Sequence, residues 1–263
     1  MILPEIKSQK NNKDFFIYFA ADEKYFDEYG KCLINSCLKN VPDYGIHSHL
    51  YNPTQNQIDF CVKRGVSLSY EYIEESLFEK VSVEILSEKN RDSIVSKIPY
   101  TKKRMNLKES IYNIKRTYFA CSRFIRLCQI KKPEQYCLSI DVDGIVRKKF
   151  NYIFNDGKDF HLYEKSGSKK GKHLSGAILF NNTEKSNCFL NRYSEIINQN
   201  IKNDNIYWSL DQIILDKIVL EYNKGILPID YVDWNMSEFS CIWSAKGPRK
   251  ELLKFKQEQG KYK

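Results

Sequence analysis

Glycine and proline are scarce in this chain, with 11 and 7 residues among 263. So few breakers of regular structure argue against a long linker or a disordered, low-complexity segment. The sequence also has no run of about 18 apolar residues, the length that a membrane-spanning helix needs. Its polar start carries no stretch that resembles a signal peptide. We therefore expect a cytoplasmic protein, in a bacterial, viral or host cytosol, without a transmembrane segment.

The cysteines form no Cys-x-x-Cys pair, although the chain contains eight of them. Most lie inside apolar segments with regular periodicity, and we interpret them as reduced core residues. Hydrophobic residues make up 42% of the chain and aromatic residues 14%, which is typical of a globular protein with a sizeable core.

The charge is unbalanced, with 42 Lys and Arg against 33 Asp and Glu and a formal net charge of +9. Such an excess favours anionic partners, among them nucleotide phosphates, nucleic acid or an acidic membrane surface at which the protein makes peripheral contact. The basic residues gather at 97–108, at 165–172 and from 246 to the end. Simple solubility remains the alternative explanation for these clusters.

Apolar runs and helical periodicity predict a β-α-β-α-β start, with strands at 15–20, 46–51 and 66–70 and helices at 26–38 and 54–64. Residues 71–106 are rich in charge, and we predict no regular secondary structure for them. Farther on we predict helices at 107–128, 189–197 and 210–219, strands at 136–140, 160–163, 173–182 and 226–229, and a short helix or turn at 150–154. No repeat or domain linker interrupts this alternation.

An apolar strand ends in two aspartates, Asp141 and Asp143, that are separated by one residue and followed by Gly144. Side chains at i and i+2 of an extended chain point to the same side, so both carboxylates can face one point. Two close carboxylates call for a cation, and Mg²⁺ or Mn²⁺ prefers such oxygen ligands. A solvated turn is the alternative for an isolated Asp-x-Asp. His47 and His49 also share a strand face, which we interpret as a partly exposed face and not as a metal site.

The order of the motifs along the chain resembles that of GT-A nucleotide-sugar glycosyltransferases, most of all the glycogenin and lipopolysaccharide galactosyltransferase group. The resemblance runs from about residue 15 to residue 250 and joins the nucleotide-binding β-α-β start, Arg123 on the long helix, the aspartate pair, and the small-residue strand at Ser175. Asp211-Gln212 and a Gly- and Lys-rich terminal segment complete it. It implies an α/β fold of GT-A type in a single domain at 1–250, with a Rossmann-like mixed central sheet flanked by helices and a basic C-terminal tail at 251–263.

The resemblance also implies a role for each motif. Asp141 and Asp143 resemble the pair that holds Mn²⁺ or Mg²⁺ against the diphosphate of a UDP-sugar. The expected donor contacts are Ala20, Ala21 and Asp22 for the uridine and ribose, Ser175 and Gly176 for the sugar, and Lys246, Gly247 and Lys250 for the diphosphate. Arg123 resembles the arginine that steadies the donor. Asp211 and Gln212 resemble the catalytic edge of a retaining enzyme, in which the departing phosphate takes the acceptor's proton.

One position departs from the family pattern. Ser244 stands where the family usually places a histidine that completes the metal shell. Serine, water or the packing of Trp243 can fill the gap, and Mg²⁺ readily keeps waters.

The acceptor is open between a glycan, a lipid-linked glycan and a hydroxymethylated base in DNA, for which the lysine clusters suit phosphate contacts. The alternative function is a nucleic-acid or polyanion binding module on a degenerate scaffold, with a structural aspartate pair. A two-metal nuclease or phosphotransferase is disfavoured, because the chain has no P-loop and no further acidic motif.

Overall fold

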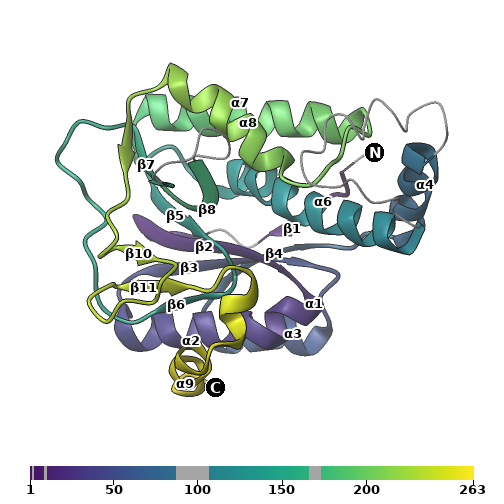
Figure 1. The fold of residues 1–263 in the computed structure, drawn as a ribbon. Coiled ribbons are helices and arrows are strands. Elements are labelled where there is room, and N and C mark those ends of the chain that lie inside the picture. Colours follow the sequence, from purple (N-terminus) through teal and green to yellow (C-terminus); the bar gives the residue numbers. More distant parts are fainter. Residues whose placement is uncertain (2, 9–10, 87–106, 166–172) are drawn as a thin grey trace.

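An eight-stranded mixed sheet forms the centre of the molecule in the computed structural model, which describes residues 1, 3–8, 11–86, 107–165 and 173–263 (Figure 1). Its strand order is β1-β4-β3-β2-β5-β8-β7-β9. The strands are β1 (Lys7–Ser8), β2 (Phe15–Asp22), β3 (Gly45–Tyr51), β4 (Ser67–Glu71), β5 (Tyr136–Ile140), β7 (Phe160–Glu164), β8 (His173–Phe180) and β9 (Lys224–Ile226). Strands β4, β3, β2 and β5 run parallel, and β8 is antiparallel to both β5 and β7.

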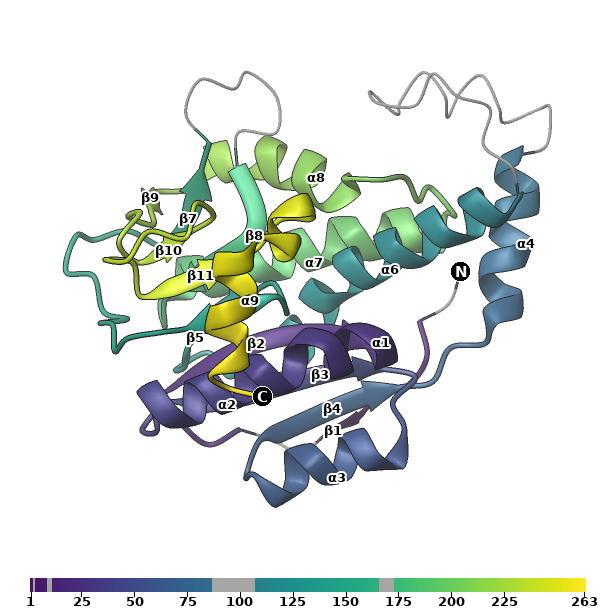
Figure 2. The same cartoon turned by 60° about the horizontal axis from the view of Figure 1, so that its bottom comes forward.

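Helices cover both faces of this sheet (Figures 1 and 2). One face carries α1 (Glu23–Tyr25), η1 (Phe26–Gly30), α2 (Lys31–Asn40) and α3 (Gln55–Lys63); the other carries α4 (Glu75–Leu86), α6 (Leu107–Ile130), α7 (Glu184–Lys202), α8 (Leu210–Ile218) and η2 (Val219–Glu221). Alternate residues of β2 belong to different cores, with Ile17 in the cluster that includes α2 and Tyr18 in the cluster that includes α6. The expected mixed sheet flanked by helices is confirmed.

A second, three-stranded sheet brings the end of the chain to the aspartate pair. It consists of β6 (Gly144–Val146), β11 (Ile242–Ser244) and β10 (Val232–Asp233). Strand β11 lies antiparallel to β6 and places Ser244 opposite Gly144, directly after Asp143. Residues that are 100 positions apart in the sequence thereby become neighbours.

Three sequence expectations differ from the structure. Residues 150–154 form neither a helix nor a turn and have no regular secondary structure; Phe150 is buried, and Tyr152 stacks on Phe15 with ring centres 4.2 Å apart. Part of the stretch expected to be irregular forms α4, which buries Phe78. The strand expected at 226–229 is β9 instead, and it ends two residues before Pro228, which has no backbone N–H to donate.

The last thirteen residues, expected as a basic tail, include a packed helix. The first of them, Glu251, ends η3 (Gly247–Glu251), and eight of the others form α9 (Leu253–Gly260). Phe255 and Tyr262 are buried, and Asn40 donates a hydrogen bond to the Tyr262 hydroxyl at 3.0 Å. The two buried aromatic side chains therefore pack this lysine-rich segment against the rest of the protein. The charge pattern of the sequence does not reveal this packing.

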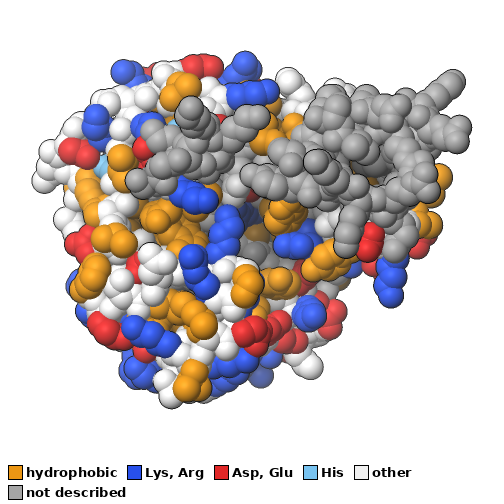
Figure 3. All heavy atoms as spheres, in the orientation of Figure 1, with side chains coloured by type: hydrophobic (Ala, Val, Ile, Leu, Met, Phe, Trp, Pro, Cys, Tyr) orange, Lys and Arg blue, Asp and Glu red, His pale blue; other side chains and the backbone are white. Residues whose placement is uncertain are grey.

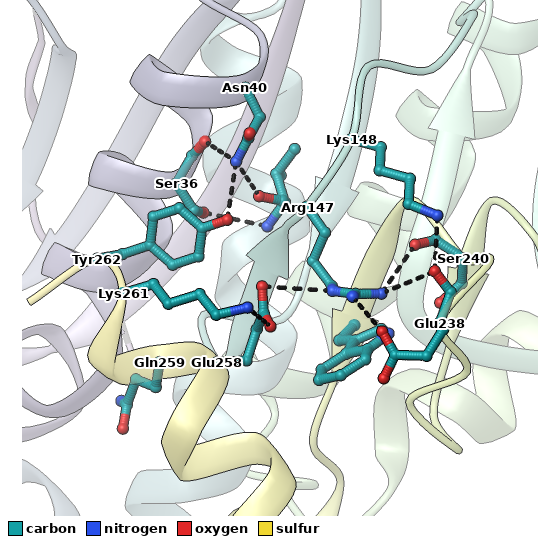
Figure 4. A network of polar contacts seen from close by, with 12 residues as sticks. Ser36, Asn40, Arg147, Lys148, Glu238, Ser240, Glu258, Gln259, Lys261 and Tyr262 are labelled. Carbon is teal, nitrogen blue, oxygen red and sulfur yellow. Dashed lines mark hydrogen bonds and ion pairs between the residues drawn. The ribbon is translucent and has the colours of Figure 1, made fainter.

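Arg147 connects this segment to the rest of the protein (Figure 4). Its guanidinium lies 3.8 Å from the ring centre of Trp243 and pairs with Glu238 at 2.7 Å and with Glu258 of α9 at 3.4 Å. The same side chain donates to backbone carbonyls of residues 237, 238 and 240. The segment from β11 to α9 is thus held at both ends, which fixes the position of η3 between them.

The basic clusters at 97–108 and 165–172 lie mostly outside the described residues. In the described ranges, no helix is both long and apolar enough to cross a membrane. All eight cysteines are free thiols, and five of them are buried, whereas Cys188 is exposed.

His47 and His49 are fully buried, contrary to the expected partly exposed face, and both lie within 2.9 Å of the Ser69 hydroxyl. Burial, with the neighbouring His49 charge, lowers the pKa of His47 from 6.5 to about 3. The folded state holds His47 neutral, whereas the unfolded chain protonates it below about pH 6.5. The free energy of unfolding is therefore highest above pH 6.5 and falls as the pH falls.

We expect the free energy of unfolding to drop by about 2 kcal/mol between pH 6.5 and pH 5 on account of His47, at about 1.4 kcal/mol per pH unit. Urea unfolding at several pH values should show a shallower dependence in His47→Gln, because glutamine does not titrate. Equal pH slopes for the variant and the wild-type protein would contradict the assignment.

Candidate active site

A cavity of about 330 Å³ opens where β2, β5, α6 and the terminal segment meet. Figure 3 shows Lys and Arg side chains around the hollow in the middle of this face. The residues that line the cavity are Ala20, Ala21, Asp22, Tyr25, Arg116, Phe119, Ala120, Arg123, Asp141, Val142, Asp143, Trp208, Lys246, Gly247 and Lys250. Since β2 and β5 are parallel neighbours, their carboxyl ends deliver Asp22 and Asp141 to the same edge of the sheet.

The aspartate pair lies in the turn after β5 and not in the extended chain itself. The Gly144 amide closes this turn on the Asp141 carbonyl at 3.0 Å, and the Asp141 amide donates to the Gly176 carbonyl at 3.0 Å. Both carboxylates nevertheless line the cavity, as the sequence predicts, but the turn produces this arrangement and not the alternation of a strand.

Arg123 is a cationic residue in the lining of the cavity, and it pairs with two acids. Its guanidinium contacts Asp141 at 2.5 Å and lies 3.7 Å from Asp211, and it donates to the Ser175 carbonyl at 3.0 Å. Burial alone would raise the pKa of Asp141, but the Arg123 charge outweighs burial and holds that pKa below its usual value. Burial raises the pKa of Asp211 despite the same guanidinium, while the Ser175 hydroxyl donates to Asp211 at 2.5 Å.

Asp143 is paired with a lysine from the end of the chain. The Lys250 ammonium lies 2.7 Å from one Asp143 oxygen and over the rings of Tyr25 and Tyr29, 4.6 and 4.8 Å from their centres. Burial and the Asp141 charge raise the pKa of Asp143 to about 6. Burial opposes the charge on Lys250, but Asp143 outweighs it and raises the pKa of Lys250. The partly exposed Asp141 and the buried Asp143 thus each have their own basic partner.

Gly176 is required by the packing behind the aspartate pair. A Cβ atom at this position would lie 2.6 Å from Asp141 Oδ2 and 3.5 Å from the Trp234 ring. The group that approaches Gly176 most closely is therefore the Asp141 carboxylate. The glycine leaves Asp141 Oδ2 room beside the cavity.

The structure divides the predicted site residues into two groups. Nine of them line the cavity: Ala20, Ala21, Asp22, Arg123, Asp141, Asp143, Lys246, Gly247 and Lys250. Ser175, Gly176 and Asp211 are buried behind Arg123, and Gln212 follows them at the start of α8 without lining the cavity. Sequence reasoning missed Tyr25, Arg116, Phe119 and Trp208. Of these, only Tyr25 lies close in sequence to a predicted site residue, three positions after Asp22. The Asp22 side chain accepts a hydrogen bond from the Tyr25 amide at 2.8 Å.

The oxygen atoms in the cavity fit a hard divalent cation. The carboxylates of Asp141 and Asp143 both line the cavity, and the Ser244 hydroxyl is 3.4 Å from Asp143 Oδ1. Within the described residues, no group of three or more His, Cys, Asp and Glu side chains could hold a metal ion. Asp141 and Asp143 would therefore hold Mg²⁺ or Mn²⁺ with help from Ser244, water and substrate oxygens, a set that Mg²⁺ accepts.

No protein-family model matches this sequence, and no curated protein matches it. Several solved structures share its fold. The galactosyltransferase LgtC, solved in complex with donor and acceptor sugar analogs, has a TM-score of 0.57 at 12% identity, covering 94% of this chain and 95% of that one. The glycosyltransferase GlyE of Streptococcus pneumoniae TIGR4 has a TM-score of 0.55 at 13% identity, and the bifunctional glycosyltransferase WbbM 0.54 at 11%.

The match covers 95% of this chain in both of the latter cases, but only 60% of GlyE and 50% of WbbM. At such low identity the similarity establishes the fold, which is that of the GT-A glycosyltransferases.

Proposed function

We propose that the protein is a metal-dependent, retaining glycosyltransferase that moves a sugar from a UDP-sugar to an acceptor hydroxyl. The observation that carries the proposal is the cavity itself, in which two carboxylates and three cationic side chains from separate parts of the chain converge: Asp141, Asp143, Arg123, Lys246 and Lys250. The volume of about 330 Å³ suits a ligand pocket. The shared fold with glycosyltransferases supports the proposal.

The chemistry follows from where the positive charge lies. The acceptor oxygen bonds to the anomeric carbon as the bond from that carbon to the UDP oxygen breaks, and the departing phosphate gains the electron pair and takes the acceptor's proton. Negative charge therefore develops on the phosphate, and Lys246 and Lys250 face the cavity where they can stabilise it. A Mg²⁺ or Mn²⁺ ion, when bound to the aspartates, supplies further positive charge to the diphosphate. Arg123 keeps Asp141 ionised and oriented toward the cavity.

Calorimetry with UDP tests this proposal. We expect UDP to bind in the presence of Mn²⁺, to lose affinity with a chelator, and to bind Asp141→Ala at least about a hundredfold more weakly, because a charged ligand of the ion is lost. Asp14→Ala, at an exposed aspartate before β2, is the matched control and should bind normally. Binding that neither the chelator nor Asp141→Ala changes would refute the metal-dependent site.

A salt titration with duplex DNA addresses the acceptor. We propose a glycan or lipid-linked glycan as the acceptor. A DNA acceptor, or the alternative of a nucleic-acid binding module, predicts instead a steep loss of affinity with rising salt, because phosphate contacts release counterions. DNA binding with such a slope, together with the absence of hydrolysis for every sugar nucleotide offered, would favour the binding module.

A further inference from the structure

Arg116 lies in the wall of the same cavity without a role in the chemistry above. It is on α6, seven residues before Arg123 and so about 10 Å farther along the helix axis. Its guanidinium carbon lies 4.2 Å from the ring centre of Trp208 and 5.2 Å from that of Tyr112. The side chain thus leans on aromatic surface at a place well separated from the aspartate pair.

Among the described residues, no acid compensates the charge of Arg116. Arg123 pairs with Asp141, and Lys250 pairs with Asp143, but across the described parts of the chain no carboxylate forms an ion pair with Arg116. A guanidinium stays protonated in proteins and presents its N–H groups in one plane. Contact with an indole orients that plane while leaving the N–H groups free for a carboxylate or a phosphate.

The residue that follows Trp208 has a strained backbone. The Trp208 side chain is 39% exposed at the cavity, and the next residue, Ser209, has a φ of 69° in the left-handed region. A non-glycine residue there costs about 1 kcal/mol or more and persists where the surroundings demand it. Helix α8 starts directly afterwards and buries Asp211 behind Arg123. The same turn thus fixes Trp208 in the wall and Asp211 behind it.

We propose that Arg116 binds a carboxylate or phosphate that the substrate carries in addition to the donor's diphosphate, and that Trp208 is the positioning residue for its guanidinium. This inference rests on the proposed function. The anionic group has two possible sources, a uronic acid in the sugar of the donor or a charged acceptor. Lys246 and Lys250 already face the site of the diphosphate, so that group does not account for Arg116.

The test compares neutral sugars with sugars that carry one anionic group, a carboxylate or a phosphate. Calorimetry with Mn²⁺ measures UDP, UDP-glucose and UDP-glucuronate; steady-state transfer compares glucose with glucose 6-phosphate as acceptors. The variants are Arg116→Met, Arg116→Lys and Trp208→Leu. Lys115→Met is the matched control, since it removes a positive charge from the adjacent position of α6, where Lys115 pairs with Glu75 outside this cavity.

We expect Arg116→Met to lose roughly tenfold to a hundredfold in affinity, or in KM, for one charged ligand and to leave UDP and the neutral ligands unchanged. Loss confined to UDP-glucuronate identifies the donor sugar as the source, and loss confined to glucose 6-phosphate identifies the acceptor. Arg116→Lys should retain part of the affinity, and Trp208→Leu should weaken the same charged ligand with little change in kcat.

Two results would overturn the inference: an equal loss for UDP itself, which would assign Arg116 to the nucleotide, or no difference between charged and neutral ligands in wild-type protein. These results are distinct from a failure of the proposed function, in which the wild-type protein binds neither UDP nor either UDP-sugar.

Discussion

Lys250→Met is expected to weaken UDP binding by roughly tenfold or more and to slow sugar transfer by about a hundredfold, yet to strengthen the binding of Mn²⁺ to the nucleotide-free protein. The two effects have opposite signs because Lys250 occupies Asp143, at 2.7 Å, when no substrate is present. Under the proposed function, its ammonium would have to leave this carboxylate before a metal ion could take it, and the diphosphate would offer the lysine a new anionic partner. Removing the lysine frees Asp143 but also removes a charge that stabilises the departing phosphate.

Manganese titration followed by electron paramagnetic resonance measures the first effect, and calorimetry with UDP together with turnover of a UDP-sugar measures the second. Lys256→Met is the matched control, since Lys256 lies nearby on α9 but pairs with the exposed Glu251. It should change neither quantity. Weaker Mn²⁺ binding in Lys250→Met would show that the lysine assists the metal site and does not compete with it.

The sequence predicted the elements whose apolar pattern is continuous or strictly periodic. Strand β5 was placed at 136–140, and β2, α6 and β8 within a few residues of their ends. Strands such as β2 are buried on both faces. Both faces therefore require apolar residues, and the strand appears in the sequence as a continuous apolar run. The convergence of Asp22 and Asp141 could also be predicted, because parallel strands end at one edge. Their roles in binding a donor stay predictions.

The features that the sequence did not reveal depend on tertiary contacts. The lysine-rich sequence at 251–263 gave no sign that Phe255 and Tyr262 anchor α9. In the sequence alone, Arg116 cannot be distinguished from a solvated arginine, because its contact with Trp208 exists only in the folded protein. The turn at Ser209 that brings them together has no glycine to mark it. Interactions between side chains that are 92 positions apart, as here, leave no local periodicity to detect.

Arg123→Met should lower the free energy of unfolding by about 3 kcal/mol, because it leaves the buried Asp211 and the partly exposed Asp141 without a counter-charge. The side chain of Arg123 is 9% exposed, and that of Asp211 8%. Urea unfolding measures the loss, and Arg192→Met, at an exposed arginine of α7, is the control. An unchanged unfolding free energy in Arg123→Met would mean that solvent or a proton compensates the two acids.

The double variant Arg123→Met/Asp211→Asn separates stability from function. Since asparagine removes one uncompensated charge and keeps its size, we expect it to recover more than half of the lost unfolding free energy. Sugar transfer should stay at least about a hundredfold below wild type, because Asp141 still lacks the guanidinium that orients it toward the cavity. Recovery of both quantities together would show that Arg123 serves the fold alone, and that the donor site needs only the charges of the terminal segment.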